Sequence, residues 1–206
     1  HDLIKKNFSE HQRIIFNGNG YSDAWIAEAE RRGLPNIRSM VEAIPELLAD
    51  KSVNLFEKFG VFTRAELESR VEVKYENYAK TINIEAKTMI DMAAKQFIPA
   101  VIRYTKTLAD AIVSIRAAGV EEVSVQKKLL EDCSVLLRKT QEALKSLTEI
   151  EAKACVMEEG KEQAEFYHNM VVPAMEALRE PVDELEMLVD KEMWPMPSYG
   201  DLLFEV

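Results

Sequence analysis

The chain has 206 residues, of which 47% are hydrophobic and 30% charged, so it is long enough for one globular domain and not disordered in composition. A formal charge of −10 argues against nucleic acid or an anionic membrane surface as a partner, because both attract basic faces. No apolar run is long enough to span a bilayer and the N-terminus lacks a signal-peptide core, so we expect a cytoplasmic protein that binds neither membrane nor nucleic acid.

The first sixty residues predict short helices separated by loops. The chain starts at His1 without an initiator methionine, as expected for a piece of a longer protein or for a tag remnant. Two Asn-Gly steps in residues 17–20 favour positive φ angles and predict a tight turn. Ser22 is a good N-cap residue and predicts a helix from there to Gly33. We therefore assign residues 1–60 to a small, irregular helical N-terminal part.

Residues 61–190 predict three long helices separated at Gly119 and Gly160, because glycine commonly follows a helix C-terminus. Thr63 and Glu66 form a capping box that predicts the start of the first helix. Its apolar side chains recur about every 3.6 residues, the α-helical repeat. They are Tyr75, Tyr78, Ile82, Ala86, Met89, Ala93, Phe97, Val101, Tyr104, Leu108, Ile112 and Ile115. Pro99 should kink or break this helix near residues 95–99.

The second and third helices repeat the amphipathic pattern. The second has steps of three and four residues, close to coiled-coil spacing, at Leu130, Cys133, Leu137, Thr140, Leu144, Leu147, Ile150, Ala154 and Met157. In the third, Pro173 and Pro181 should bend or split the helix. We predict an all-α fold in which three long helices, one or two of them kinked at proline, form an antiparallel bundle. The N-terminal part, the bundle and an ordered tail at residues 191–206 are expected to form one structural unit.

The tail is rich in aromatic residues and proline. Trp194, Tyr199 and Phe204 are too apolar to remain wholly in water. They would either pack back onto the bundle, which we favour, or dock into a partner.

One glycine-rich stretch resembles a phosphate-binding loop. Gly18-Asn19-Gly20 precedes a helix whose N-terminus could attract an anion. The Lys-Ser/Thr of a P-loop is missing, and Asp23 stands where a dinucleotide fingerprint has its third glycine. A structural turn is the preferred interpretation.

No residue pattern supports a metal or redox centre. Glu165 and His168 form a single Glu-x-x-His pair, whereas four-helix di-iron sites use two, so a hydrogen-bonded or exposed histidine is favoured over a metal ligand. Cys133 and Cys155 lie 22 residues apart on one predicted helix, roughly 33 Å, which is beyond disulfide reach. We expect both thiols to be buried and assign no catalytic, cofactor-binding or metal-binding residue.

Three stretches resemble a known family. The first comprises residues 13–23 (RIIFNGNGYSD) with Trp25, residues 28–30 and residues 32–34; the others are residues 77–86 without Ala79, and the ends of the tail at 194–195 and 199–206. Together they are similar to the C-terminal region of type III glutamine synthetases, and the resemblance covers nearly the whole chain.

The resemblance implies a parent enzyme that joins ammonia to glutamate through a γ-glutamyl phosphate made from ATP, with divalent metals such as Mg²⁺ held by carboxylates. It also implies a catalytic domain upstream and a large ring-shaped homo-oligomer. None of the family's metal ligands or nucleotide contacts matches a position here. ATP and Mg²⁺ are therefore expected in the parent enzyme, with no cofactor bound by this chain.

We accordingly predict an accessory C-terminal helical domain, inactive alone, that serves assembly, bracing or regulation. Its partners would be the upstream catalytic domain and neighbouring subunits. The residues expected at these contacts are Asn17, Gly18, Asn19, Gly20, Tyr21, Trp194, Tyr199 and Phe204. The alternatives are a free-standing helical scaffold that binds a partner helix and a carboxylate-bridged metal enzyme.

Overall fold

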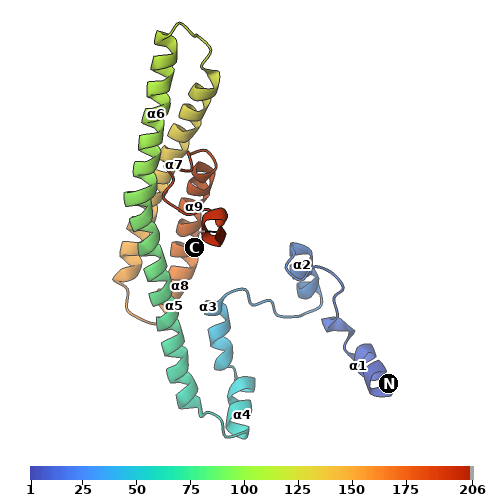
Figure 1. Cartoon of the computed structure of the whole chain (residues 1–206). Helices are drawn as coiled ribbons and strands as arrows, with labels where there is room; N and C mark the ends of the chain where they lie inside the picture. Colours follow the sequence, from blue (N-terminus) through green and yellow to red (C-terminus); the bar gives the residue numbers. More distant parts are fainter. Residues whose placement is uncertain (205–206) are drawn as a thin grey trace.

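The computed structural model describes residues 1–204, and every regular element within them is helical. Figure 1 shows a long bundle with two smaller helical segments near its lower end. The predicted all-α bundle is confirmed. Its three long helical segments alternate in direction, because short connections at residues 118–123 and 156–160 turn the chain back.

The first long segment comprises α5 (Arg64–Met92), η3 (Ala93–Phe97) and α6 (Ile98–Ala117). The predicted capping box begins it: the Glu66 amide donates to the Thr63 hydroxyl at 3.3 Å, and the Thr63 amide donates to the Glu66 carboxylate at 2.7 Å. These bonds satisfy two amides that a helix start leaves without a partner. At the far end Gly119 has φ +87°, a left-handed conformation that ends the helix at little steric cost.

Pro99 does not break this segment. The preceding turn, η3, is a π-helix, and α6 continues from Ile98. Proline lacks an N–H and its ring crowds the carbonyl of Lys95, four residues earlier. A wider π turn accommodates such a mismatch inside a continuous helix. The expected irregularity is therefore present as a π turn, without a break.

The same arrangement recurs in the third segment, which comprises α8 (Lys161–Phe166), η4 (Tyr167–Val171) and α9 (Val172–Glu186). Here η4 is again π-helical and ends two residues before Pro173, as η3 ends two residues before Pro99. The local sequences match, with a β-branched residue before the proline and an alanine after it. Of the two predicted outcomes at Pro181, a bend or a split, the split does not occur, because α9 runs through this buried proline without interruption.

The second long segment is α7 (Ser124–Cys155), which packs against α6 along one part of its length and against α9 along another. Alanines and larger apolar residues fill the space between the three segments. The main core includes Ala86, Ala93, Val101, Cys133, Leu147, Ala154, Tyr167, Val171, Leu178 and Leu185. The α6–α7 hairpin extends beyond the end of α9 (Figure 1).

Cys155 does not lie in this core. Cys133 is buried as predicted, but Cys155 is exposed, so the expectation of two buried thiols is wrong. The helical repeat explains the difference. Ala154 occupies the core position, and the next residue is rotated about 100° away from it, toward solvent.

The N-terminal sixty residues comprise two parts. α3 (Met40–Ala43), η2 (Ile44–Leu47) and α4 (Asp50–Lys58) lie beside the lower end of the bundle. Val41 and Ile44 pack there on Val71, Tyr75 and Ala164 in a second core. Residues 1–33, which we call the arm, contain α1 (Asp2–Glu10), η1 (Gln12–Ile14) and α2 (Asp23–Arg31). Figure 1 shows the arm extending away from the bundle.

Candidate functional site

The loop predicted as a contact site lies fully at the surface of the arm. Asn17, Gly18, Asn19, Gly20 and Tyr21 are all exposed, and Tyr21 is 100% exposed. The Asn19 side-chain oxygen accepts a hydrogen bond from the Tyr21 amide at 3.0 Å. The Asn19 carbonyl accepts from the Ser22 hydroxyl at 2.7 Å and from the Ser22 amide at 3.2 Å. A tight turn therefore forms, but at residues 19–22, two residues later than the predicted 17–20.

The prediction of positive φ at the Asn-Gly steps is wrong. Neither Gly18 nor Gly20 adopts the left-handed conformation, because the turn is closed by the Asn19 side chain and carbonyl. Gly18 has another role. A Cβ atom at this position would lie 2.5 Å from the end of the Phe16 ring, so any other residue would make that ring shift.

The arm has a small folded centre of its own. The Phe16 and Trp25 rings lie 4.4 Å apart, and the Arg32 guanidinium lies over Trp25 at 5.8 Å. Arg32 also donates to the carbonyl of Ile15 at 2.7 Å, which joins α2 to the segment before the loop. As predicted, Ser22 caps α2, accepting from the Trp25 amide at 3.4 Å. These contacts involve the residues of the first family-like stretch and fix the shape of the exposed loop.

An acidic residue completes this centre. Hydrogen bonds from Arg31, and then from Arg32, lower the pKa of Glu28 to about 2. The carboxylate is therefore ionised throughout the neutral range and holds both guanidinium groups at one end of α2.

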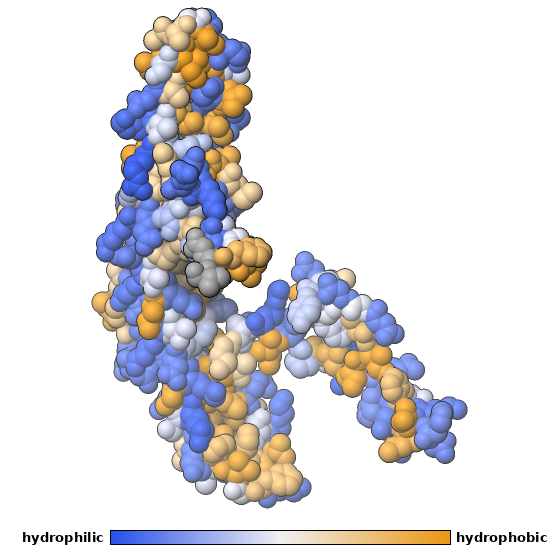
Figure 2. Space-filling model, viewed as in Figure 1, coloured by the Kyte–Doolittle hydropathy of each residue, from blue (hydrophilic) through white to orange (hydrophobic). Residues whose placement is uncertain are grey.

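Apolar side chains of the arm face solvent. Leu3, Ile4 and Phe8 on α1 and Ile14 on η1 are exposed, and no residue of α1 is buried. Figure 2 shows hydrophobic surface along the arm beside hydrophilic surface. The sequence does not mark these residues as a contact surface, because an amphipathic stripe looks the same whether its apolar face meets this chain or another one.

The predicted tail residues have two different environments. Trp194 is 9% exposed and belongs to the main core. Its ring stacks on Phe97 at 5.1 Å, and its indole N–H donates to Glu186 at 3.2 Å. The preferred expectation that the tail packs back onto the bundle is thus confirmed for Trp194. Tyr199 and Phe204 do not follow it, because they are 85% and 81% exposed.

The described part of the tail contains a short helix, α10 (Tyr199–Phe204), whereas residues 205–206 of the predicted tail lie outside the described residues. Asp201 holds its start, accepting from the amide and hydroxyl of Ser198 at 2.7 and 2.8 Å and pairing with Lys191 at 2.7 Å. The hydrogen bond from Lys191, followed by those from Ser198, lowers the pKa of Asp201 to about 2. α10 is thereby fixed to the tail while its apolar residues, including Leu202 and Leu203, remain exposed.

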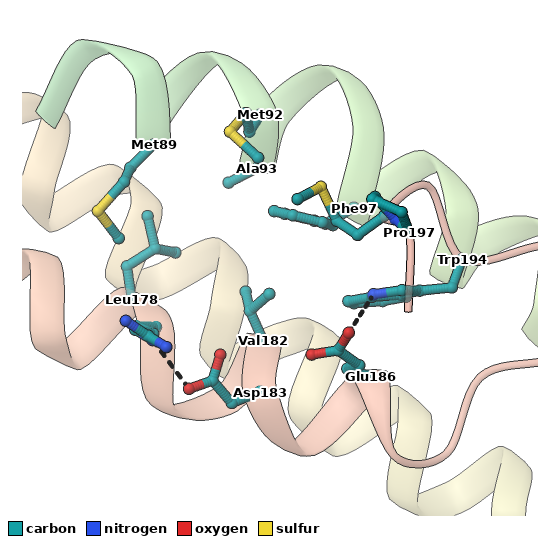
Figure 3. A pocket seen from close by; sticks show the side chains of 12 residues that line it. Met89, Met92, Ala93, Phe97, Leu178, Val182, Asp183, Glu186, Trp194 and Pro197 are labelled. Atoms are coloured by element: carbon teal, nitrogen blue, oxygen red, sulfur yellow. Dashed lines mark hydrogen bonds and ion pairs between the residues drawn. The ribbon is translucent and has the colours of Figure 1, made fainter. Parts of the chain in front are cut away.

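A pocket of about 400 Å³ lies where the tail crosses η3 and α9. Figure 3 shows Phe97 and Trp194 at one end and Met89 with Leu178 at the other. The remaining lining residues are Met92, Ala93, Arg179, Val182, Asp183, Glu186, Met196 and Pro197. Of the charged groups, Arg179 binds Asp183 at 3.0 Å and Glu186 accepts from Trp194. The pocket therefore offers apolar surface suited to a hydrophobic side chain.

The Glu-x-x-His pair has ordinary structural partners. The Tyr78 hydroxyl lies 3.2 Å from Nδ1 of His168, and Glu165 pairs with Lys161 at 3.5 Å. Across residues 1–204, no group of three or more His, Cys, Asp or Glu side chains is placed to hold a metal ion. No helix in the same range has the length and apolar character needed to cross a membrane.

Comparison with known proteins identifies the family. The family described as glutamine synthetase C-terminal domain matches residues 1–116. The chain is 35% identical to a glutamine synthetase of Butyrivibrio fibrisolvens, 31% to one of Bacteroides fragilis and 30% to the type-3 glutamine synthetase of Dictyostelium discoideum. These matches cover 98 to 100% of this chain but only 28 to 29% of each relative. The chain therefore belongs to the glutamine synthetase C-terminal domain family.

Proposed function

We propose that the chain is the accessory C-terminal helical domain of a cytoplasmic type III glutamine synthetase. An upstream catalytic domain would join ammonia to glutamate with ATP and Mg²⁺. The present residues would attach to that domain and to neighbouring subunits of a homo-oligomer. In this arrangement the bundle would stiffen the assembly, and the ligation reaction would take place in the catalytic domain.

The exposed apolar face of the arm carries this proposal. Leu3, Ile4, Phe8 and Tyr21 are held on a locally folded segment, and no side chain within residues 1–204 buries them. Exposing such a surface to water is unfavourable by about 25 cal/mol per Å² of apolar area relative to burial. A locally rigid arm loses little conformational entropy on docking, which favours a contact with another part of the enzyme.

The tail supplies a second contact surface. Trp194 anchors the tail internally, so Tyr199 and Phe204 on α10 are the residues available to a partner. The exposed loop at Asn17, Gly18, Asn19 and Gly20 would contribute backbone polar groups to the arm interface. The arm and α10 lie at opposite ends of the sequence, which suits a domain that contacts more than one neighbouring subunit or domain.

The acidic side chains of residues 1–204 do not fit a Mg²⁺ site. Mg²⁺ binds through carboxylates in near-octahedral geometry, and within residues 1–204 no set of acidic residues converges in this way. We therefore assign metal and nucleotide binding to the catalytic domain. The purified chain should form no glutamine from glutamate, ammonia, ATP and Mg²⁺, and robust turnover would refute this division of labour.

The docking role is tested in a full-length enzyme that contains this chain. Replacing Leu3 and Phe8 by aspartate should reduce ring assembly, measured by mass photometry across a concentration series. The control is Ile84→Asp, at a similarly exposed position on α5. If the arm variant assembles like the control, the arm is not an assembly contact.

A further inference from the structure

The pocket between η3, α9 and the tail is apolar inside and acidic at its edge. Aromatic and methionine side chains, among them Phe97, Trp194 and Met92, form its wall (Figure 3). Asp183 and Glu186 border it from α9, and both are exposed. Its volume of about 400 Å³ is typical of ligand pockets, and flexible methionine side chains adapt to an inserted apolar group. The pocket therefore suits a large apolar side chain that has positive charge beside it.

Negative charge is concentrated in the part of the chain that forms this edge. Residues 161–206 contain eleven acidic and three basic residues, so they carry eight of the ten net negative charges of the chain. Each of the three basic residues pairs with an acidic residue of the same stretch, as Lys161 with Glu165, Arg179 with Asp183 and Lys191 with Asp201. The remaining negative charge favours a partner that brings a cationic group to the pocket.

Helix α1 of the arm offers this combination of side chains. Phe8 is 60% exposed, and no residue of α1 is buried against the described residues 1–204. Lys5 lies three positions before Phe8, on the same side of the helix, and both border one groove at the surface of the arm. Lys6 lies about 160° around the helix from Phe8. One face of α1 thus presents an aromatic ring beside an ammonium group.

We propose that the arm of one copy of this chain docks on the bundle of a second copy, with Phe8 in the pocket beside Trp194 and Lys5 facing Asp183 and Glu186. This inference rests on the proposed role of the arm as a subunit contact and identifies the surface that receives it. The arm extends away from its own bundle and is therefore accessible to another copy (Figure 1). Because the two surfaces differ, each copy can donate one arm and accept another.

Cross-linking between copies tests this contact in a full-length enzyme that contains the chain. Two differently tagged subunits are co-expressed in a Cys155→Ser background, one with Ser9→Cys beside Phe8 and the other with Met196→Cys at the pocket. A short bismaleimide should join positions 9 and 196 of different copies, as identified by mass spectrometry of the cross-linked peptide. Ile84→Cys replaces Met196→Cys in the control and should give at least about tenfold less product. No 9–196 product between copies, or an equal yield with the control, would overturn the proposal.

Variants of α1 test which side chains make the contact. Phe8→Ala and Lys5→Glu should each lower the yield of the 9–196 product about tenfold, because the first removes the apolar anchor and the second reverses the charge beside it. Lys6→Glu changes the net charge equally but on the opposite side of α1, and it should alter the yield less than twofold. Equal effects of Lys5→Glu and Lys6→Glu would contradict the proposed pairing with Asp183 and Glu186.

Ring assembly separates failure of this inference from failure of the proposed function. Met92→Trp should fill the pocket and reduce assembly as strongly as the arm variant with Leu3 and Phe8 replaced by aspartate. Met196→Asp, at the partly exposed pocket edge, makes the same test without crowding the core. If only the arm variant reduces assembly, the arm is a contact that docks elsewhere, and this inference alone is wrong. If neither arm nor pocket variants reduce it, the proposed assembly role is wrong as well.

Discussion

Replacing Trp194 by alanine should release the C-terminal tail from the bundle and destabilise the whole chain. Trp194 is the point at which the tail enters the main core, through its stack on Phe97 and its hydrogen bond to Glu186. Alanine removes the ring, leaves a void beside η3 and leaves Glu186 without this donor. The tail beyond it, including α10, then has only weak attachments.

The expected loss in the free energy of unfolding follows from the burial of the Trp194 side chain. Replacing a core Phe or Trp by alanine typically costs 3–5 kcal/mol, and an aromatic stack adds about 0.5–1.5 kcal/mol beyond area burial. We expect about 3 kcal/mol, the lower end, because a tail at the end of the chain can detach without opening all three helices. For a chain of this size that corresponds to a melting temperature about 6–12 °C lower.

Circular dichroism at 222 nm during thermal unfolding measures this change, and hydrogen exchange at residues 188–193 reports release of the tail. Trp194→Phe should recover much of the loss because a ring can still stack on Phe97. Tyr199→Ala changes an exposed aromatic residue of the same tail and should stay within about 0.5 kcal/mol of the parent. A Trp194→Ala protein that melts within 2 °C of the parent would refute the anchoring role.

Three further predictions concern local structure. Gly160→Ala should cost about 1–3 kcal/mol in urea titrations, because φ is +133° there, whereas Gly20→Ala should be neutral; equal effects would contradict this reasoning. The Glu28 carboxyl should titrate near pH 2 when followed by carbon NMR. Its stabilisation of the arm is then complete above about pH 4.5 and is lost as the pH falls toward 2. A midpoint near pH 4.5 would show that Arg31 and Arg32 do not stabilise the carboxylate. Gly18→Ala should change the fluorescence of Trp25, because the added methyl group collides with the Phe16 ring that packs against it. An unchanged spectrum would contradict the close approach.

Helix boundaries could be predicted because local chemistry decides them. The Thr63 capping box and the stop at Gly119 depend on residues within one turn of each helix end. Gly160, expected as a helix stop, is instead the N-cap of α8, because α7 already ends at Cys155. The apolar repeats likewise defined the core face of α7, including the position of Ala154.

The response to proline could not be predicted from local rules. Pro99 and Pro173 follow π turns inside segments that remain continuous, and Pro181 lies inside α9. Packing along neighbouring helices stabilises these segments enough to offset the bond that each proline removes.

The contact surfaces were only partly predictable. Trp194, Tyr199 and Phe204 have similar apolar character, yet one is buried and two are exposed. The apolar character of an aromatic residue favours its burial, but the tertiary fold decides whether other residues of this chain cover it. For the same reason the sequence does not show which surface the apolar residues of α1 meet.

The most direct test of the account compares hydrogen exchange in this chain with exchange of the same residues in a full-length glutamine synthetase that contains it. Docking through the arm and tail predicts slower exchange at residues 1–33 and 199–204 in the full-length enzyme, with the α5 and α7 cores unchanged. Arm and α10 amides that exchange equally fast in both proteins would contradict the proposal that these surfaces attach the bundle to the enzyme.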